Sequence, residues 1–372
     1  MAVAASVPFF SPAGAAFGVD LAACLRQVVD SGLYVLGPRV RDFEAAFADY
    51  VGVPHAIGVA NGTDALVLAL RALEIGAGSR VALVANAGYY GSAAAATVGA
   101  APLYVDVDAA TLTMAPAALS AVLAQGGVDA VLVTHLYGQM ADMDRLSDLC
   151  RQVGVPLIED CAQAHGAAWA GRPAGAWGAL ACFSFYPTKN LGALGDGGAV
   201  VTGDAALAAR LRALRQYGWG RKYEVLAPGG ANSRLDELQA AVLLAKLPRL
   251  DAANAERRAI AGRYGAQLAG LPLTLPPPPG EGSVAHLYVI RTPRRQALQA
   301  RLVALGIGCD VHYPVPDHLQ PVRQGRGGFH LPVTEAACAQ VLSLPCYPGL
   351  QPAQQDRVIA AVHDFFAEAG TC

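Results

Sequence analysis

The chain has 372 residues, with 27 basic and 29 acidic side chains and a formal net charge of -2. It has no long run of basic residues that would suit nucleic acid or an anionic membrane, so we expect neither partner. Its eight cysteines are scattered without a CxxC pair, which argues against a bound metal and a disulfide framework and favours a reducing cytoplasm. The most apolar stretch, 81–105, contains Asn86, Pro102 and three glycines, so we expect a buried strand and helix there rather than a membrane span.

The first part of the chain predicts helices at 18–31 and 39–51, joined by the turn-prone SGLYVLGP. Tyr34 in this turn can face a ligand or pack against the protein. An apolar run then ends at Ala60, followed by Asn-Gly-Thr and a helical segment from Asp64. This strand, small-residue turn and helix start would aim free backbone N–H groups at an anion, but a plain N-cap explains the pattern equally well.

From residue 81 onwards, short apolar runs alternate with helical segments. The runs are 81–85, 102–108, 130–135 and 156–160, and helices are expected at 115–125 and 141–153. Such repeats predict a mainly parallel sheet covered by helices, with ligands at the carboxyl ends of the strands. Asp160 stands at such an end, where a buried carboxylate needs a cationic or hydrogen-bonding partner. A cap of the next helix is the alternative role.

The stretch FSFYPTKNLGALGDGGAVVT, 183–202, is β-prone at both ends and holds a single lysine, Lys189, before a glycine-rich turn. A solvated lysine on a loop is one interpretation. A lysine between a buried strand and such a turn is also placed to lose its proton by desolvation, and a neutral amine can form a Schiff base with a carbonyl. The carbonyl most often met in this way is pyridoxal phosphate.

The remaining sequence predicts an amphipathic helix at 204–218 and a long helix from Ser233. After the proline run 275–282, strands are expected at 286–292 and 306–314 around a helix at 294–305, with a last helix at 352–369. We expect a large domain over 1–250 and a smaller α+β domain over 251–372, with the N-terminal segment able to pack on the small domain. No GxGxxG follows the first strand, so a nicotinamide-binding fingerprint is absent.

Nine segments, by their order and spacing, resemble the DegT/DnrJ/EryC1/StrS family of pyridoxal-phosphate-dependent nucleotide-sugar aminotransferases. They cover nearly the whole chain and are GLYVLGPRVRDFE, VANGTDALVLAL, VTHLYGQMADMD, IEDCAQAHGA, FSFYPTKNLGALGDGGAVVT, NSRLDELQAA, HLYVIRT, HYPVPDHLQP and LSLPCYP. The resemblance implies an α/β, aspartate-aminotransferase-like fold (fold type I). It also implies pyridoxal 5′-phosphate as cofactor, with pyridoxamine 5′-phosphate as the intermediate form.

By position in these segments, the resemblance implies that Lys189 is the Schiff-base lysine and proton carrier. Asp160 would keep the pyridine nitrogen protonated. Gln163 would bond the phenolic oxygen of the cofactor, with a helix-surface amide as the alternative. Implied phosphate contacts are Gly62, Thr63 and Ser184, and also Asn232, which would reach the phosphate of the neighbouring subunit in a homodimer with two shared sites.

One departure from the family lies in ANAGYYGSAAA, where many relatives carry a PSxTF- or PSxTW-like segment. Alignment assigns the aromatic that stacks on the cofactor ring to Tyr89, with Tyr90 as the competing choice. His165 is as readily a packed residue behind the site as a catalytic one. Candidate contacts to the sugar or its diphosphate, each with a packing role as the alternative, are Tyr34, Tyr186, Lys222, Tyr223, His312, Tyr313 and His318.

The resemblance implies transfer of an amino group from L-glutamate to a nucleotide-linked keto-sugar. The segments are more similar to relatives that aminate C3 of a dTDP-3-keto-6-deoxyhexose than to those that aminate C4 of a UDP-, GDP- or dTDP-4-keto sugar. Dehydratase relatives have His in place of Lys189, and an amino-acid aminotransferase would have a differently patterned small domain. A non-catalytic sugar-binding or regulatory relative is the alternative from another class. The presence of Lys189, Asp160 and Gln163 counts against it.

Overall fold

Seven strands form the central sheet in the order β1-β9-β8-β5-β4-β2-β3, in a computed structural model that describes residues 6–323 and 328–368. Strand β9 pairs antiparallel with β1 and β8, and the four other pairs are parallel. The predicted α/β class with a mainly parallel sheet is confirmed. The strands are β1 (His55–Val59), β2 (Arg80–Val84), β3 (Ala101–Val105), β4 (Ala130–Thr134), β5 (Leu157–Asp160), β8 (Leu180–Ser184) and β9 (Gly198–Thr202).

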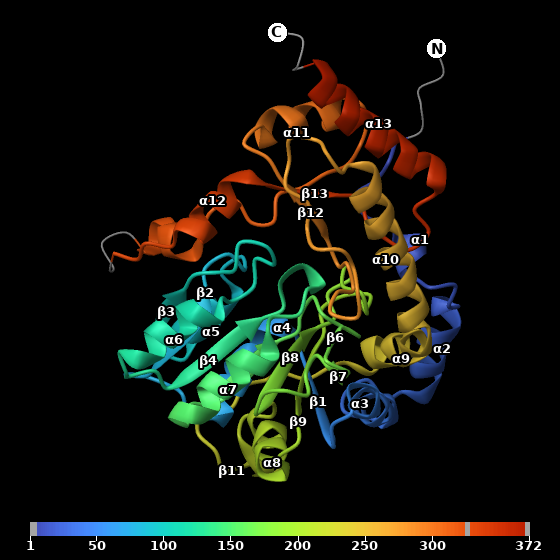
Figure 1. The fold of residues 1–372 in the computed structure, drawn as a ribbon. Coiled ribbons are helices and arrows are strands. Elements are labelled where there is room, and N and C mark those ends of the chain that lie inside the picture. The colour runs from blue at the N-terminus through green and yellow to red at the C-terminus, as the bar shows by residue number, and fades with distance from the viewer. Residues whose placement is uncertain (1–5, 324–327, 369–372) are drawn as a thin grey trace.

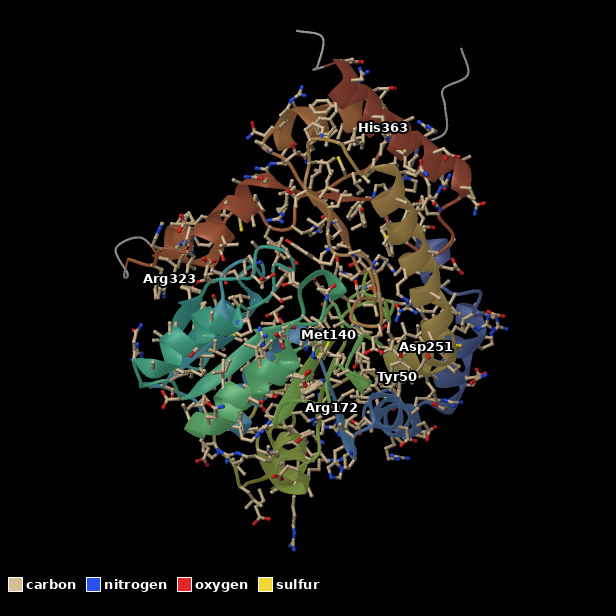
Figure 2. All side chains as sticks on the ribbon, in the orientation of Figure 1. Tyr50, Met140, Arg172, Asp251, Arg323 and His363 are labelled. Carbon is tan, nitrogen blue, oxygen red and sulfur yellow. The ribbon has the colours of Figure 1, made fainter. Side chains whose placement is uncertain are left out.

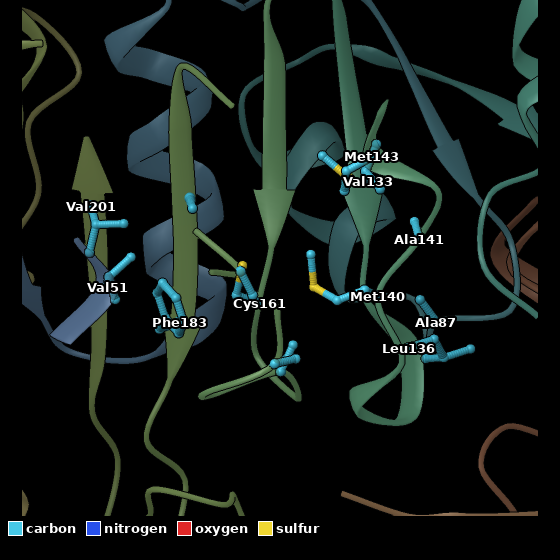
Figure 3. Packing of buried hydrophobic residues seen from close by; sticks show 14 of the residues in the cluster. Val51, Ala87, Val133, Leu136, Met140, Ala141, Met143, Cys161, Phe183 and Val201 are labelled. Atoms are coloured by element: carbon cyan, nitrogen blue, oxygen red, sulfur yellow. The ribbon is translucent and has the colours of Figure 1, made fainter. Parts of the chain in front are cut away.

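Helices cover both faces of this sheet. The strands carry apolar side chains that point to the two faces in turn, so both faces need cover. On β2, Ala82 and Val84 belong to one buried cluster, whereas Val81 and Leu83 belong to another. The first cluster, part of which Figure 3 shows, receives side chains from α3 (Pro38–Val51), α6 (Pro116–Ala124), α7 (Met143–Val153) and α9 (Glu237–Lys246). The second receives side chains from α4 (Gly62–Ala72), α5 (Tyr90–Thr97) and α8 (Ala205–Leu214).

Helix α10 (Leu250–Gln267) leads from this sandwich to a smaller unit that lies above it in Figure 1. At its start, the Tyr50 hydroxyl of α3 donates to the Asp251 carboxylate at 2.6 Å (Figure 2). Further along, Ile260 and Tyr264 join the core of the smaller unit. The other elements of this unit are β12 (Tyr288–Arg291), α11 (Arg295–Ala304), α12 (Pro332–Gln340), β13 (Val341–Leu344) and α13 (Pro352–Glu368). The division at 250/251 stays a prediction, and it falls at the first residues of a helix that contributes to both cores.

Most of the remaining elements are short. They are α1 (Pro12–Ala15), α2 (Leu21–Ser31), β6 (Ala168–Trp169), β7 (Arg172–Pro173), β10 (Trp219–Arg221), β11 (Glu224–Val225) and the 3₁₀ helices η1 (Leu136–Gly138), η2 (Leu247–Arg249), η3 (Asp317–Leu319) and η4 (Pro321–Arg323). Near the N-terminus, Val7 bridges Ile307 and joins the core of the smaller unit. The chain start therefore packs beside the last third of the sequence.

The prediction of a strand at 306–314 is wrong. Ile307 and Asp310 make only single bridges, and the strand that pairs with β12 is β13. Gly306 has a positive φ of 69°, and Gly308 follows two residues later, so a regular strand is interrupted at its start.

The helix expected from Ser233 begins instead at Glu237. The backbone N–H of Ser233 donates to the carbonyl of Arg215, and Asn232 bridges Gln216, so the segment stays extended before the helix. Three predicted features lie partly outside the described residues. They are the last helix at residue 369, the cysteine Cys372, and the N-terminal segment at residues 1–5.

In the part of the chain that the structure describes, no helix combines the length and apolar character that a membrane span requires. The seven described cysteines are all free thiols. The predicted cytoplasmic location stays a prediction.

Candidate active site

A cavity of about 760 Å³ lies where the carboxyl ends of the parallel strands face the smaller unit. On the sheet side, its walls are residues that end or follow β1, β2, β4, β5 and β8. On the other side, they come from α10, from the segments around β12 and β13, and from residues 310–313. The lining includes nine of the candidate residues: Gly62, Thr63, Asp160, Gln163, Ser184, Tyr186, Lys189, His312 and Tyr313. Sequence segments far apart therefore meet at one site, at the sheet edge expected for a ligand.

Lys189 lies on the loop between β8 and β9, where its backbone N–H donates to the carbonyl of Tyr186 at 2.8 Å. The side chain is half-buried and borders the cavity. Burial lowers the pKa of Lys189 to about 8, although the nearby carboxylate of Asp160 acts to raise it. A substantial fraction of the amine is therefore neutral near pH 8, which a nucleophile or proton carrier requires.

Asp160 is the last residue of β5 and is 5% exposed. One carboxylate oxygen accepts the backbone N–H of Ala162 at 3.1 Å, and the other accepts the Thr134 hydroxyl at 3.3 Å. Burial raises the pKa of Asp160 above its usual range, while these bonds and Lys189 act to lower it. A cation in the cavity would relieve this burial penalty, as a protonated pyridine nitrogen does.

Glu159, next to Asp160 in the strand, faces a different environment and is 0% exposed. Its carboxylate accepts the backbone N–H groups of Gly175, Trp177 and Gly178 at 2.7–2.9 Å and contacts His135 at 3.1 Å. With Cys161 and His135 it forms a buried group whose potential metal-ligand atoms lie within 4.8 Å of one another. Because the carboxylate already has protein partners, we infer that this group holds residues 175–178 in place.

The start of α4 forms a small cradle. Asn61 caps this helix by accepting the Asp64 N–H at 2.8 Å, so the cap is Asn61 rather than Thr63 or Asp64. Gly62 lies against Ser184, and a Cβ at position 62 would stand 2.6 Å from the Ser184 Cβ. The start of an 11-residue helix with a nearby hydroxyl is suited to a phosphate group.

Gln163 joins the two sides of the cavity. Its Oε1 accepts the backbone N–H of Tyr137 at 2.6 Å, and its Nε2 donates to the Tyr313 hydroxyl at 3.2 Å. The second Nε2 hydrogen remains for a ligand. His165 is fully buried between Phe183 and Phe185, and burial lowers its pKa to about 3. It is therefore neutral and lies behind the cavity lining.

The two adjacent tyrosines are placed differently. Tyr89 has a positive φ of 71°, and the residue that borders the cavity is Tyr90, the competing choice. The ring of Tyr90 lies 6.1 Å from that of Tyr313 at 77°. The role of Tyr89 in ring stacking stays a prediction, and Tyr89 does not border the cavity.

Besides Tyr89, five predicted site residues do not border the cavity. Tyr34 is 50% exposed in the turn before α3, and Tyr223 is 77% exposed beside Lys222 in the β10–β11 hairpin. Asn232 lies in the extended segment beside Gln216. His318 is buried and bonds the Glu335 carboxylate at 3.0 Å, which places it in the packing of α12. This chain alone therefore does not bring these five residues to the site.

Sequence reasoning missed several lining residues of the smaller unit. Arg257 is 4% exposed, and its guanidinium donates to the carbonyls of His286 and Cys346 at 3.2 and 2.6 Å. His286 bonds the Asn190 side chain, next to Lys189, at 2.8 Å. The family-like segments HLY and LPCYP contain His286 and Cys346, whereas Arg257 lies in an ordinary helical pattern.

The residues present fit pyridoxal phosphate. Lys189 supplies a partly neutral amine, Asp160 a carboxylate whose pKa is raised by burial, and the Gly62–Ser184 contact a phosphate cradle. These three features border one cavity.

Comparison with known proteins agrees with this geometry. The DegT/DnrJ/EryC1/StrS aminotransferase family matches residues 17–363. The dTDP-3-amino-3,4,6-trideoxy-alpha-D-glucose transaminase of Streptomyces venezuelae is 46% identical over 347 residues, which are 92% of this chain and 91% of that protein. The UDP-N-acetyl-3-dehydro-alpha-D-glucosamine 3-aminotransferase of Acidithiobacillus ferrooxidans is 43% identical over 339 residues, or 90% of this chain and 91% of that protein.

Among solved structures, the S. venezuelae protein DesV in complex with a ketimine intermediate is similar to this chain, with a TM-score of 0.93 and 44% identity. The match covers 97% of this chain and 99% of DesV. Sequence and structure lead to the same conclusion. The chain belongs to the DegT/DnrJ/EryC1/StrS aminotransferase family.

Proposed function

We propose that this chain uses pyridoxal phosphate to transfer an amino group from L-glutamate to C3 of a nucleotide-linked keto-sugar. The first candidate substrate is a dTDP-3-keto-6-deoxyhexose. The observation that carries the proposal is the amine of Lys189, which borders the same cavity as the buried Asp160 carboxylate and has a pKa lowered to about 8. Two similar proteins, one named for dTDP and one for UDP, are both named for the 3-position of a sugar, which supports C3 and leaves the nucleotide open.

The protein residues divide the chemistry between them. When bound, pyridoxal phosphate supplies an electron sink for the bond that breaks at the substrate carbon. The Nζ atom of Lys189 takes and returns the proton, which requires the neutral amine that burial favours. Asp160 would keep the ring nitrogen protonated, and Gly62, Thr63 and Ser184 would hold the phosphate.

The sugar would bind beside Tyr186, His312 and Tyr313. His312 bonds the Ser343 hydroxyl at 2.9 Å and stacks on Phe9 at 5.8 Å, so its ring orientation is fixed. Burial lowers the pKa of His312, which favours the neutral ring. A neutral imidazole can donate or accept a hydrogen bond from a sugar hydroxyl.

We propose a homodimer that completes each site. Tyr34, Lys222, Tyr223 and Asn232 lie outside the cavity of their own chain. Exposed apolar side chains gather in the same segments, namely Leu33, Tyr34, Val35, Tyr217, Tyr223, Val225 and Leu226. A second copy could cover these side chains and receive Asn232 at its phosphate.

The first experiment is the visible absorption spectrum of the purified protein, loaded with pyridoxal phosphate, before and after excess L-glutamate. We expect a visible band from the lysine-bound cofactor that disappears with glutamate. A protein that stays colourless after incubation with pyridoxal phosphate would refute the proposal and favour a non-catalytic binding protein.

The position of the new amine requires a panel of 3-keto and 4-keto sugar nucleotides. We expect the visible band to return with 3-keto substrates, and proton NMR of the product to place the amine at C3. Return of the band only with 4-keto substrates would establish the C4 alternative.

Shared sites can be tested by mixing two inactive variants, Lys189→Ala and Asn232→Ala, under conditions of subunit exchange. Each mixed dimer would contain one intact site, so an equal mixture should recover about one quarter of the wild-type activity. No recovery, with subunit exchange verified by mass spectrometry, would place Asn232 at the site of its own subunit or outside both sites.

A further inference from the structure

One carboxylate outside the cavity holds part of its wall. Asp317 begins η3, four residues after Tyr313, and is 1% exposed. Its Oδ1 accepts the backbone N–H of Tyr89 at 2.9 Å, and its Oδ2 accepts the Ser92 hydroxyl at 2.6 Å. Its own backbone N–H donates to the carbonyl of Ala85 at 2.7 Å. Asp317 is therefore bound at three points to residues 85–92, which follow β2.

The same loop packs against the cavity residue Tyr313. Gly88 has a positive φ of 75°, and a Cβ at this position would stand 2.8–2.9 Å from three ring carbons of Tyr313. The ring of Tyr90 meets Tyr313 edge-on at 6.1 Å, and both rings border the cavity. Any displacement of residues 85–92 would therefore move Tyr90 relative to Tyr313.

We propose that Asp317 is a positioning residue that fixes residues 85–92 and so holds Tyr90 against Tyr313 on the cavity wall that receives the sugar. The assignment of this wall to the sugar rests on the proposed function. The hydrogen bonds explain how the effect reaches the site, because the bonded Tyr89 amide is adjacent to Tyr90 in the chain. Asp317 itself does not border the cavity.

The surroundings of Asp317 support this role over a purely structural one. Its acceptor atoms meet neutral donors, and burial raises its pKa to about 7 while the two bonds act to lower it. Neighbouring titratable or charged groups are Tyr104, which contacts Ser92 at 3.1 Å, Cys338, Arg323 over the Tyr104 ring, and the His318–Glu335 pair. Because the folded protein holds the Asp317 proton more tightly than the unfolded chain does, the free energy of unfolding falls as the pH rises through about 7. Near pH 8 the ionised Asp317 therefore opposes folding, which argues against a purely structural role.

The test compares Asp317→Leu, which removes both acceptors, with Asp317→Asn, which keeps the Oδ1 acceptor and removes the charge. Asp129 provides a matched control, because it likewise accepts a backbone N–H from another segment, that of Arg80 at 2.7 Å, but is exposed. Hydrogen–deuterium exchange of a peptide covering 87–92 is measured for the loaded enzyme at pH 8. Melting temperature and the kinetics of each half-reaction are measured in parallel.

In Asp317→Leu we expect exchange at 87–92 to increase and the KM for the keto-sugar nucleotide to rise about tenfold, equivalent to one lost hydrogen bond of about 1.4 kcal/mol. The rate with L-glutamate should stay within about twofold of wild type. Asp317→Asn should restore most of the exchange protection and melt at a higher temperature than wild type at pH 8. Asp129→Leu should match wild type in exchange and in KM.

Unchanged exchange in Asp317→Leu would overturn the positioning role. Equal losses in the glutamate and sugar half-reactions would also overturn it, because they would show general support of the fold or of the cofactor. If the wild type converts no keto-sugar nucleotide, the proposed function fails, and the exchange measurement still decides whether Asp317 fixes the loop.

Discussion

Two lysines of this protein have the same lowered pKa and different surroundings. Burial lowers the pKa of both Lys189 and Lys246 to about 8. Lys246 of α9 is 3% exposed, donates to the carbonyl of Gly192 and lies 5.0 Å over the ring of Phe17. Lys189 borders the cavity with Asp160. One amine is closed off by the protein, and the other faces a space that can hold a ligand.

The comparison shows that a lowered pKa does not by itself identify a catalytic lysine. A buried amine is costly wherever it occurs, and structural lysines lose basicity as catalytic ones do. What distinguishes Lys189 is access to the cavity and a carboxylate at the carboxyl end of a parallel strand.

The largest effect is expected for Lys189→Ala. Removal of the amine should lower transamination by at least about a thousandfold, because nucleophile and proton carrier are lost together. The fold should be kept, since the side chain is only half-buried. Steady-state turnover and the far-ultraviolet circular dichroism spectrum check both points. Turnover at the wild-type rate would remove Lys189 from the mechanism.

A smaller loss is expected for Asp160→Asn, which keeps the shape of the side chain and removes its charge. We expect the rate to fall by about a hundredfold, because the protonated ring nitrogen loses its counter-ion, and the cofactor to dissociate more readily. Stopped-flow rates with L-glutamate and equilibrium dialysis of the cofactor measure the two effects. A rate equal to that of wild type would exclude Asp160 from the site.

The pH dependence of cofactor capture tests the amine directly. The neutral form of Lys189 is the nucleophile, so the rate at which the cofactor-free protein develops the visible band should rise with pH around a midpoint near 8. Because the Asp160 carboxylate raises the pKa of Lys189, Asp160→Asn should move this midpoint to lower pH. A midpoint that rises or stays fixed in the variant would contradict this coupling.

Local patterns in the sequence were sufficient to predict the residues on which these tests act. Lys189 was identifiable as a single lysine between a β-prone segment and a glycine-rich turn, and Asp160 as a carboxylate that ends an apolar run. The sequence did not distinguish the environments of Glu159 and Asp160. Glu159 is bonded to backbone amides of residues 175–178, and nothing near Glu159 in the sequence indicates that contact.

The parts that sequence reasoning missed depend on contacts between distant segments. Arg257 borders the cavity because α10 extends from one core to the other, and helical periodicity alone does not show where such a helix leads. The same limit applies to 306–314, where β-prone residues met too few pairing partners to form a strand. Tyr90 rather than Tyr89 borders the cavity because of a turn with positive φ, which an alignment of segments does not resolve.

The smallest effect on activity is expected for Lys246→Met, the matched control for Lys189. Turnover should stay within about twofold of wild type, because Lys246 does not border the cavity. Stability should reveal the change instead. The folded protein binds the Lys246 proton less tightly than the unfolded chain does. The free energy of unfolding therefore rises with pH between about 8 and the usual lysine pKa, by at most about 1.4 kcal/mol per pH unit.

Methionine removes this contribution, so urea unfolding of Lys246→Met should depend less on pH between about 8 and 10 than unfolding of the wild type. The carbonyl of Gly192 would lose its donor, which adds a change in stability that does not depend on pH. Parallel curves for the two proteins would show that Lys246 is not a titrating buried amine. A loss of turnover comparable to that of Lys189→Ala would break the distinction between the two lysines, because it would show that the closed amine also serves the reaction.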